Sequence, residues 1–413
     1  MKKFMTMLIA IVMAVSVFAF SACGNGDKVK GSIDGKYEKV DPATDAETYA
    51  TLQEKLDNAK PAAQDAEKAG GDAKTNAEIK LTVGGKSLTL SLDAALALIL
   101  DLTKEEGLEM VSGAALNTEL GLKADKGFGA ALKGFGEKAI AADLVNGDED
   151  QNAEENQYIL GMMALIDDFK IDAELNGYIS DSNIYFDAKV TGVPDAIKSE
   201  IAKNPMAGAM INFDELASGI KYTFSEEFIQ GMVENVIGGM FGGNDYGYED
   251  YNVSDSDYEE SALQVAMYEE GDTEETSENM SLSQIMTILA NFKTELSAEM
   301  TENSTKIKLA TTDETKTMIQ QMLPLMLGGD VPADILNSIT ISKLDVELYI
   351  ALDANGVITA IAGNVDIAVS ATVLETEISI AVNGALDCSL AIPEKISFPS
   401  FEGYVNPFTT INK

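Results

Sequence analysis

Two groups of polar residues have types and spacings that could support chemistry. Lys221 follows Ser218 by three positions, and a lysine one helical turn after a serine can act as its base. The Lys-Thr-Gly and Ser-Asp-Asn motifs that accompany such a pair in serine enzymes are absent. Residues 255–260 form an acidic cluster of the kind that calcium prefers, but Glu260 stands where a calcium loop needs glycine. We therefore predict no catalytic residue and no metal site.

The composition excludes several classes of function. All 29 basic residues are lysine, and histidine and tryptophan are absent. Without histidine there is no Ser-His-Asp triad and no histidine zinc site, and without arginine there is no bidentate clamp for phosphate. A net charge of −39 repels nucleic acid and anionic lipid headgroups. The expectation is a protein that is not an enzyme, needs no cofactor and binds no nucleic acid.

The amino terminus has the form of a secretory signal. A basic start is followed by an apolar run from 5 to 20 that is too short to span a membrane. The small residues before Cys23 resemble the lipobox of bacterial lipoproteins, although Phe20 departs from the usual leucine. The resemblance implies that residues 1–22 are a signal peptide and that Cys23 carries lipid. An extracytoplasmic protein anchored to the outer face of the cell membrane is expected, and an ordinary signal peptide cut nearby is the alternative.

The rest of the chain is predicted to be a tether followed by one large domain, residues 43–413. Residues 23–42 are rich in glycine, aspartate and lysine, as a tether should be. Residues 243–279 are acidic and lack lysine, which predicts a disordered insert. Because this insert divides the chain, two half-domains, 43–242 and 280–413, are the alternative. If Cys23 carries lipid, Cys388 has no partner for an intrachain disulfide and is expected to be a small core residue.

Alternating apolar residues predict long antiparallel strands. From 343 to 392 the alternation is interrupted by turn residues at 353–356 and at Asn383-Gly384, which predicts a meander of four strands with one apolar face. Residues 79–92 alternate in the same way around Gly84-Gly85 and predict a hairpin. The aromatic tail from Ile396 to Tyr404 is expected to pack back on the sheet.

Three other stretches lead to different predictions. Residues 61–76 contain almost no large apolar side chain and are predicted to be a mobile loop or a frayed helix. Residues 92–102 are apolar almost all round a helical wheel, which predicts a buried helix. Glycines repeat in the sequence Lys-Gly-Phe-Gly at 126–129 and 133–136, where we expect them to bend a strand.

Methionine-rich amphipathic helices are predicted around residues 159–169, 229–241 and 318–327. Methionine conforms to irregular apolar partners, so these helices could cover the apolar face of the sheet and leave room for a ligand, or could simply fill the core. The residues predicted to line such a site are Met162, Met163, Ile166, Met232, Val236, Met240, Met322, Met326, Leu348, Ile350, Ile378 and Ile380.

A tethered chain with a long, one-sided antiparallel sheet and amphipathic helices resembles the lipoprotein-carrier superfamily of LolA, LolB, LppX and LprG. The resemblance rests on the order of the elements and on the meander, and this chain departs from it in length and in its acidic insert. It implies an α+β fold in which a long curved antiparallel sheet, an incomplete β-barrel, carries amphipathic helices on its apolar concave face. It also implies that a lipid or lipidated partner binds between them. A structural or protein-interaction lipoprotein of the cell envelope, without a ligand cavity, is the alternative.

Overall fold

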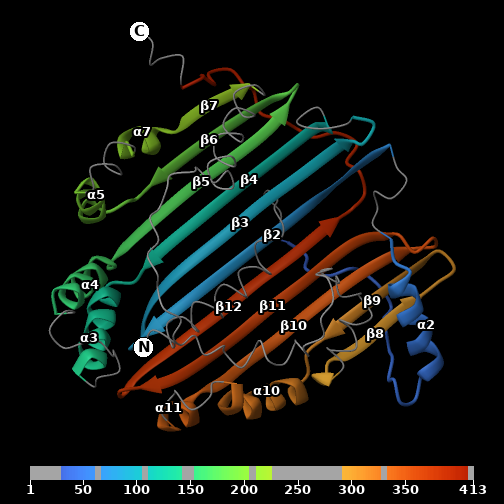
Figure 1. Ribbon diagram of the computed structural model, residues 1–413, viewed down its shortest axis with the longest axis horizontal. Coiled ribbons are helices and arrows are strands. Elements are labelled where there is room, and N and C mark those ends of the chain that lie inside the picture. The colour runs from blue at the N-terminus through green and yellow to red at the C-terminus, as the bar shows by residue number, and fades with distance from the viewer. Residues whose placement is uncertain are drawn as a thin grey trace, which may run out of the picture.

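The protein is an α+β molecule built on one open, twelve-stranded antiparallel sheet (Figure 1). The computed structural model describes residues 29–60, 67–104, 110–141, 153–203, 211–225, 291–326 and 333–407. The strands are β1 (Glu38–Lys39), β2 (Lys68–Val83), β3 (Lys86–Asp101), β4 (Val111–Ala124), β5 (Phe169–Ser180), β6 (Asn183–Thr191), β7 (Ile220–Ser225), β8 (Glu295–Met300), β9 (Ser304–Ala310), β10 (Thr340–Asp353), β11 (Ile358–Val373) and β12 (Thr376–Ser389). Their order in the sheet is β1-β8-β9-β10-β11-β12-β2-β3-β4-β5-β6-β7.

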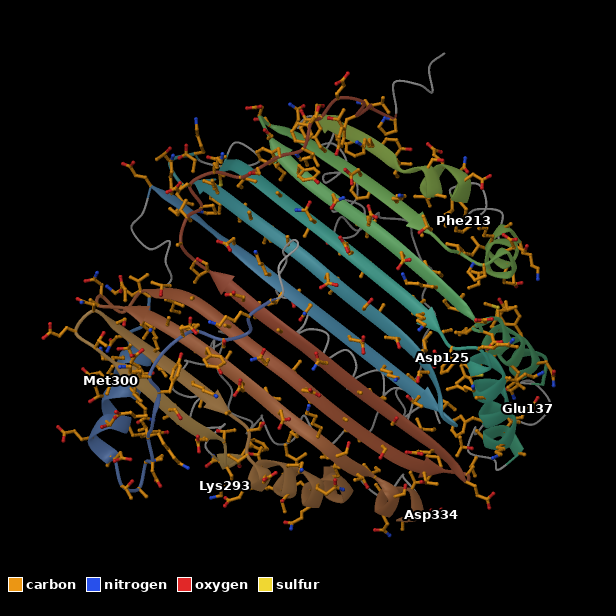
Figure 2. The ribbon with its side chains drawn as sticks, turned by 180° about the vertical axis from the view of Figure 1, so that it is seen from behind. Asp125, Glu137, Phe213, Lys293, Met300 and Asp334 are labelled. Carbon is orange, nitrogen blue, oxygen red and sulfur yellow. The ribbon has the colours of Figure 1, made fainter. Side chains whose placement is uncertain are left out.

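The helices of the described residues lie at the rim of the sheet. They are α2 (Ala46–Asp57), α3 (Phe128–Ala141), α4 (Ala153–Leu165), α5 (Asp195–Ala202), α7 (Phe213–Ser218), α10 (Asp313–Met326) and α11 (Ala333–Ser338). All of them except α2 connect successive strands at the same end of the sheet, which we call the helix-bearing end. Lys293, Asp334, Glu137 and Phe213 mark this end in Figure 2, and Met300 lies at the opposite end.

Two meanders form the sheet, and they join where β12 pairs with β2. One meander runs from β2 to β7, and the other contains β8 to β12. Because β12 and β2 are paired over twelve residues, the sheet is continuous across this junction. The assignment of one domain or two half-domains stays a prediction, and the acidic insert at 243–279 lies outside the described residues.

The strand register gives the sheet one apolar face and one polar face. Neighbouring residues in a cross-strand row share a face, whereas the next residue along each strand points to the other face. One row across the apolar face is Ile367, Val382, Ile79, Leu90, Leu122 and Ile171. The adjacent row across the polar face is Asp366, Asn383, Glu78, Ser91, Gly121 and Asp172.

Helix α2 covers the apolar face at one edge of the sheet. Its apolar residues recur at Tyr49, Leu52 and Leu56, the spacing that places them on one helical face. Leu52 and Leu56 are buried in a cluster with Ile307 and Leu352 of β9 and β10. Its packing forms the largest cluster of buried residues that the described part of the chain contains.

Two stretches predicted to be helix or loop are strands. Residues 68–76 belong to β2, and residues 92–101 belong to β3. In β3, leucines at alternate positions point to the apolar face, while Ala95 and Ala97 occupy the polar face. Because apolar residues occupy both faces of β3, its sequence does not show the two-residue alternation that identifies a strand. The segment is nevertheless a strand, because pairing with β2 and β4 outweighs the helical preference of alanine and leucine.

The glycine repeat at 126–136 is helical rather than a strand bend. It forms the start of α3, which crosses α4 closely. A Cβ atom on Gly129 would lie 2.9 Å from the carbonyl oxygen of Ala164, and one on Gly136 would lie 2.9 Å from Leu160 Cδ2. These glycines therefore permit a close helix–helix contact instead of curving the sheet.

The predicted meander has three strands, β10, β11 and β12, rather than four. Asn383-Gly384 lies inside β12, where both residues are paired on both sides. The reversal between β11 and β12 is made by Leu374 and Glu375, whose φ angles are 50° and 61°. A two-residue hairpin loop with both φ angles positive is a type I′ turn, whose usual sequence is Asn-Gly. The prediction from turn-forming residues therefore placed this turn at the wrong position in the sequence.

The Glu375→Gly variant is expected to be more stable than the native protein by about 1 kcal/mol, because glycine adopts a positive φ without steric cost. Glu375 is exposed, so the variant loses no core packing. Urea unfolding measures the change. As a matched control, Glu377→Gly replaces an exposed residue inside β12 and should destabilise. Equal effects of the two substitutions would contradict the prediction.

The aromatic tail packs on the sheet, as predicted. It lies on the polar face over β5 and β6, where Phe401 stacks on Tyr185 with ring centroids 3.7 Å apart. The hydroxyl of Tyr404 donates a hydrogen bond of 2.7 Å to Asp187. Val405 then exchanges backbone hydrogen bonds with Lys221 and Thr223 of β7. The tail thereby covers part of the open edge of β7, an edge that would otherwise be free to pair with another chain.

Candidate functional site

The middle of the apolar face is the most unusual surface of the described residues. Leu90 and Leu116 are each 39% exposed and Leu96 is 37% exposed, although all three belong to long central strands. Leu96 pairs directly with Leu116, and Leu92, which is buried, pairs with Leu120. We call Leu90, Leu92, Leu96, Leu116 and Leu120 the central apolar surface. Soluble proteins rarely expose contiguous apolar patches without a function.

The sequence creates this surface by alternation in two paired strands. Residues 88–92, which were predicted to belong to a hairpin, and residues 116–124 both alternate in the manner of a strand. The pairing of β3 with β4 aligns these leucines in rows on one face. None of the five was among the predicted lining residues, because the order of strands in the sheet was not known and the face was attributed to 343–392.

The predicted lining residues of the described chain are distributed around the sheet. Ile350 is buried with Leu348 beside it under α2, and Ile378 is buried near Ile335 of α11. Ile380 lies two residues further along β12 than Ile378 and therefore on the same face of the sheet. Leu348, Ile350 and Ile378 are therefore parts of edge and end clusters around the central apolar surface.

The methionines of the described helices lie at the helix-bearing end. Met163 of α4 faces α3, where its Sδ would lie 3.3 Å from a Cβ atom on Gly136. Met162 is exposed, and Ile166 is half-buried just after α4. Helix α10 contains Met326 and Met322, and Met322 is half-buried. Met232, Val236 and Met240 lie outside the described residues.

The helices themselves agree partly with their predicted bounds. Helix α4 ends at Leu165, and Phe169 already begins β5. Helix α10 continues past Pro324 to Met326. The predicted helix at 229–241 lies outside the described residues.

Two open hollows lie near the helix-bearing end. One, of about 580 Å³, is lined by residues of α5 and by the start of α7, including Lys198, Asn212 and Phe213. The other, of about 410 Å³, lies at the start of α10 and includes Lys293, Asp313 and Met318. Neither hollow is lined by a residue of the central apolar surface or by a predicted lining residue.

The Ser218 and Lys221 pair does not share a helical turn. Helix α7 ends at Ser218, and Gly219 has a φ angle of 90° before β7 begins at Ile220. The Ser218 hydroxyl donates to the carbonyl oxygen of Asp214, whereas the ammonium of Lys221 lies 5.4 Å from the centre of the Tyr404 ring. The geometry that would let this lysine act as the base for the serine is therefore missing.

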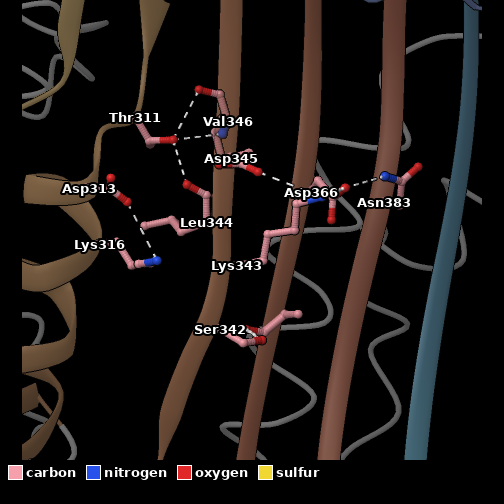
Figure 3. A network of polar contacts seen from close by, with 11 residues as sticks. Thr311, Asp313, Lys316, Ser342, Lys343, Leu344, Asp345, Val346, Asp366 and Asn383 are labelled. Atoms are coloured by element: carbon pink, nitrogen blue, oxygen red, sulfur yellow. Dashed lines mark hydrogen bonds and ion pairs between the residues drawn. The ribbon is translucent and has the colours of Figure 1, made fainter.

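The polar face carries cross-strand networks of charged residues. Asp366 of β11 accepts hydrogen bonds from Lys343 of β10 at 2.5 Å and from Asn383 of β12 at 3.0 Å (Figure 3). The carboxylate of Asp366 raises the pKa of Lys343. Within the described ranges, no three Asp, Glu or Cys residues are arranged to hold a metal ion. The acidic cluster at 255–260 lies outside the described residues.

Burial raises the pKa of the Asp387 carboxyl, and the charge of nearby Asp72 adds to this effect. The folded protein therefore binds this proton more tightly than the unfolded chain, so stability rises as the pH falls through the raised pKa. The Asp387→Asn variant should melt at a higher temperature than the native protein at pH 7. Thermal unfolding at a series of pH values should show this advantage shrinking towards pH 3. An advantage that is the same at every pH would contradict the prediction.

Cys388 is half-buried on the apolar face, between Ile361 and Ala73 in the strand register. Burial, followed by the charges of Asp72 and Asp387, raises the pKa of its thiol. A thiol with a raised pKa is a poor nucleophile at neutral pH. This position agrees with a structural role for Cys388.

No known protein family, no curated protein and no solved structure matches this chain. Among the helices of the described ranges, none has both the length and the apolar character to cross a membrane. The functional argument therefore rests on the residues and on their geometry.

Proposed function

We propose that this protein is a membrane-anchored extracytoplasmic lipoprotein that binds a hydrophobic or amphipathic, lipid-like ligand against the apolar face of its sheet. The observation that supports the proposal is the central apolar surface, where three leucines remain more than a third exposed in the middle of a twelve-stranded sheet. Covering those side chains with a ligand would remove apolar area from water at roughly 25 cal/mol per Å².

The arrangement of the sheet suits an elongated apolar ligand. The rows of leucines run across β3 and β4, which are 16 and 14 residues long. Such a surface offers mainly apolar contact along two directions, and the hydroxyl of Thr118, between Leu116 and Leu120, is a polar group that a ligand would have to desolvate. An acyl chain, which is long, flexible and uniformly apolar, has the matching chemistry.

The proposal includes the expected arrangement in which amphipathic helices pack over a concave apolar face with the ligand between. Helix α2 supports it, because this helix covers the apolar face over β8, β9 and β10. Met163 and Met322 on α4 and α10 supply adaptable apolar side chains at the helix-bearing end. The ligand would then contact the sheet from one side and helices at its margin.

Anchoring through Cys23 is part of the same proposal. Cys23 lies outside the described residues, and the support is the signal-like sequence that precedes it. One acyl chain alone holds a protein weakly on a membrane, so stable anchoring requires more than one chain. Intact mass measurement of the protein purified from its membrane should show the removal of 22 residues and the addition of lipid at Cys23.

Native mass spectrometry and lipid extraction test the ligand. The protein purified from its own membrane should carry a lipid that dissociates under collisional activation, and the emptied protein should bind an apolar fluorescent dye. An unliganded protein that takes up neither dye nor lipid would overturn the proposal.

A second candidate is a structural or interaction lipoprotein that meets a partner protein of the cell envelope. The specific observation in its favour is that the two hollows described above are open and lie away from the central apolar surface. In this case affinity capture from envelope extract would recover a protein partner reproducibly. Apolar ligands would leave the melting temperature of the purified protein unchanged.

A further inference from the structure

The amino-terminal part of the described chain is fixed on the polar face of the sheet. Residues 30–37, which we call the strap, cross β12, β11, β10 and β9 before β1 pairs with β8 (Figure 2). The whole strap falls within residues 23–42, which the sequence predicted to be a tether. Only the residues before the strap are therefore available to separate the domain from a lipid on Cys23.

Several independent contacts fix the strap. Asn364 of β11 donates a hydrogen bond of 2.7 Å to the carbonyl oxygen of Gly31. Lys306 of β9 donates one of 2.7 Å to the carbonyl oxygen of Asp34. The ring of Tyr37 packs edge-on against Tyr349, with centroids 5.8 Å apart.

The contact at Gly31 is also sterically close. A Cβ atom at this position would overlap the carbonyl oxygen of Gly363 and the side chain of Asn364. Asn364 is itself held by Glu347, which accepts its second hydrogen bond at 3.3 Å and pairs with Lys308 at 2.6 Å. Gly31 is therefore a fixed exit point on the surface of β11.

The length of the segment from Cys23 to Gly31 limits how the domain can turn. Eight residue steps separate Cys23 from Gly31, and a fully extended chain covers at most about 28 Å over that length. Strand β11 is the fifth of twelve, so the nearer side edge is four strand spacings, about 19 Å, from Gly31. Passing around that edge to the other face adds the thickness of the sheet, about 10 Å. The path from Gly31 around this edge to the apolar face is thus about as long as the fully extended segment from Cys23 to Gly31.

The strand end offers no shorter route. Asn364 lies six residues from Ile358, where β11 begins, which is about 20 Å along the strand. Adding the thickness of the sheet again gives about 30 Å. A lipid attached to Cys23 can therefore enter a bilayer readily on the polar side of the sheet, whereas reaching one that lies flat against the apolar side would take the whole segment from Cys23 to Gly31 fully extended.

We infer that the anchored protein presents its polar face to its own membrane and its apolar face away from it. This inference rests on the proposed lipidation of Cys23. The polar face does not insert into the bilayer, because its charged side chains stay hydrated. The central apolar surface is then kept out of the anchoring bilayer and is open to ligands that arrive from the envelope.

The absence of tryptophan from the sequence provides a direct test. Glu78 and Leu90 lie on the polar and apolar faces at nearly the same place, since Glu78 pairs with Ser91, the next residue after Leu90. Glu78→Trp and Leu90→Trp variants of the full chain are expressed in a bacterial host, checked for lipid by intact mass and placed in phosphatidylcholine vesicles. Energy transfer from the single tryptophan to a dansyl-labelled headgroup lipid measures proximity to the bilayer.

The expected result is at least two-fold more efficient transfer from Glu78→Trp than from Leu90→Trp. Inserting twenty Gly and Ser residues after Gly26 should equalise the two, because a long tether lets the domain turn over. Lipid-modified protein with equal transfer from both faces, stronger transfer from Leu90→Trp, or a difference that the insertion does not change would overturn the inference alone. A chain that carries no lipid would overturn the proposed anchoring, and the inference with it. Melting temperatures confirm that each variant is folded.

Discussion

The Leu116→Lys variant is expected to lose at least ten-fold in affinity for an apolar dye or an extracted lipid. Leu116 lies in the centre of the apolar face beside Leu96, so a ligand there would have to desolvate the new ammonium group. Ten-fold corresponds to about 1.4 kcal/mol, which is small compared with the cost of burying an unpaired charge. Dye titration followed by fluorescence gives the dissociation constant.

The matched control for this experiment is Glu119→Lys. It places the same side chain in the same strand, three positions later, on the opposite face of the sheet. Its affinity for the dye should stay within about two-fold of the native value, since surface substitutions away from the contact have small effects. Equal loss in both variants would show that charge, rather than the apolar face, determines binding. An unchanged affinity in Leu116→Lys would remove the central apolar surface as the binding site.

The Leu52→Ala variant is expected to lose about 3 kcal/mol of unfolding free energy. Leu52 is completely buried between α2 and the sheet, where it shares a cluster with Ile307 and Leu352. Truncating a buried leucine removes its transfer free energy and leaves a cavity, which together cost 2 to 5 kcal/mol in proteins. Urea unfolding followed by circular dichroism measures the difference.

Met300→Ala serves as the control, because Met300 is exposed at the end of β8, in the same part of the sheet. Its unfolding free energy should change by less than about 0.5 kcal/mol. A loss below 1 kcal/mol in Leu52→Ala would mean that α2 contributes little to the stability of the sheet edge. In that case the helix would be free to move from the apolar face without a large penalty.

The sequence predicted much of the strand content because the sheet exposes its two faces to different surroundings. Where one face is polar, as around Leu344–Ile350 or Ile79–Val83, the alternation of side chains is visible and the strands were found. Where alanines occupy the polar face, as in β3, the alternation disappears and a helix was predicted instead. Turns were located correctly only where their residues were typical, as at Gly84-Gly85, and not at Leu374-Glu375.

The candidate site was harder to predict, because it depends on which strands are neighbours. Leu90 was predicted to lie in a hairpin strand, whereas Leu96 lay in the predicted helix at 92–102. The position of both leucines in the middle of the sheet follows from the pairing of β2 with β12. That pairing joins residues about 300 positions apart, and nothing in the local sequence of either strand specifies it. The strap was missed for a related reason, since a segment rich in Gly, Asp and Lys has the composition of a tether and gains its order only from Asn364, Lys306 and Tyr349.

The junction between β12 and β2 also determines when the sheet can be completed during synthesis. Thr75 of β2 donates a hydrogen bond to the carbonyl oxygen of Ala385, 310 residues later. Until β12 has emerged, one edge of β2 has no partner, and the first meander presents an unpaired, sixteen-residue strand. Such long-range pairing makes folding slow and leaves the nascent chain exposed to aggregation. Completion of the sheet is therefore expected only after β12 is available to pair with β2.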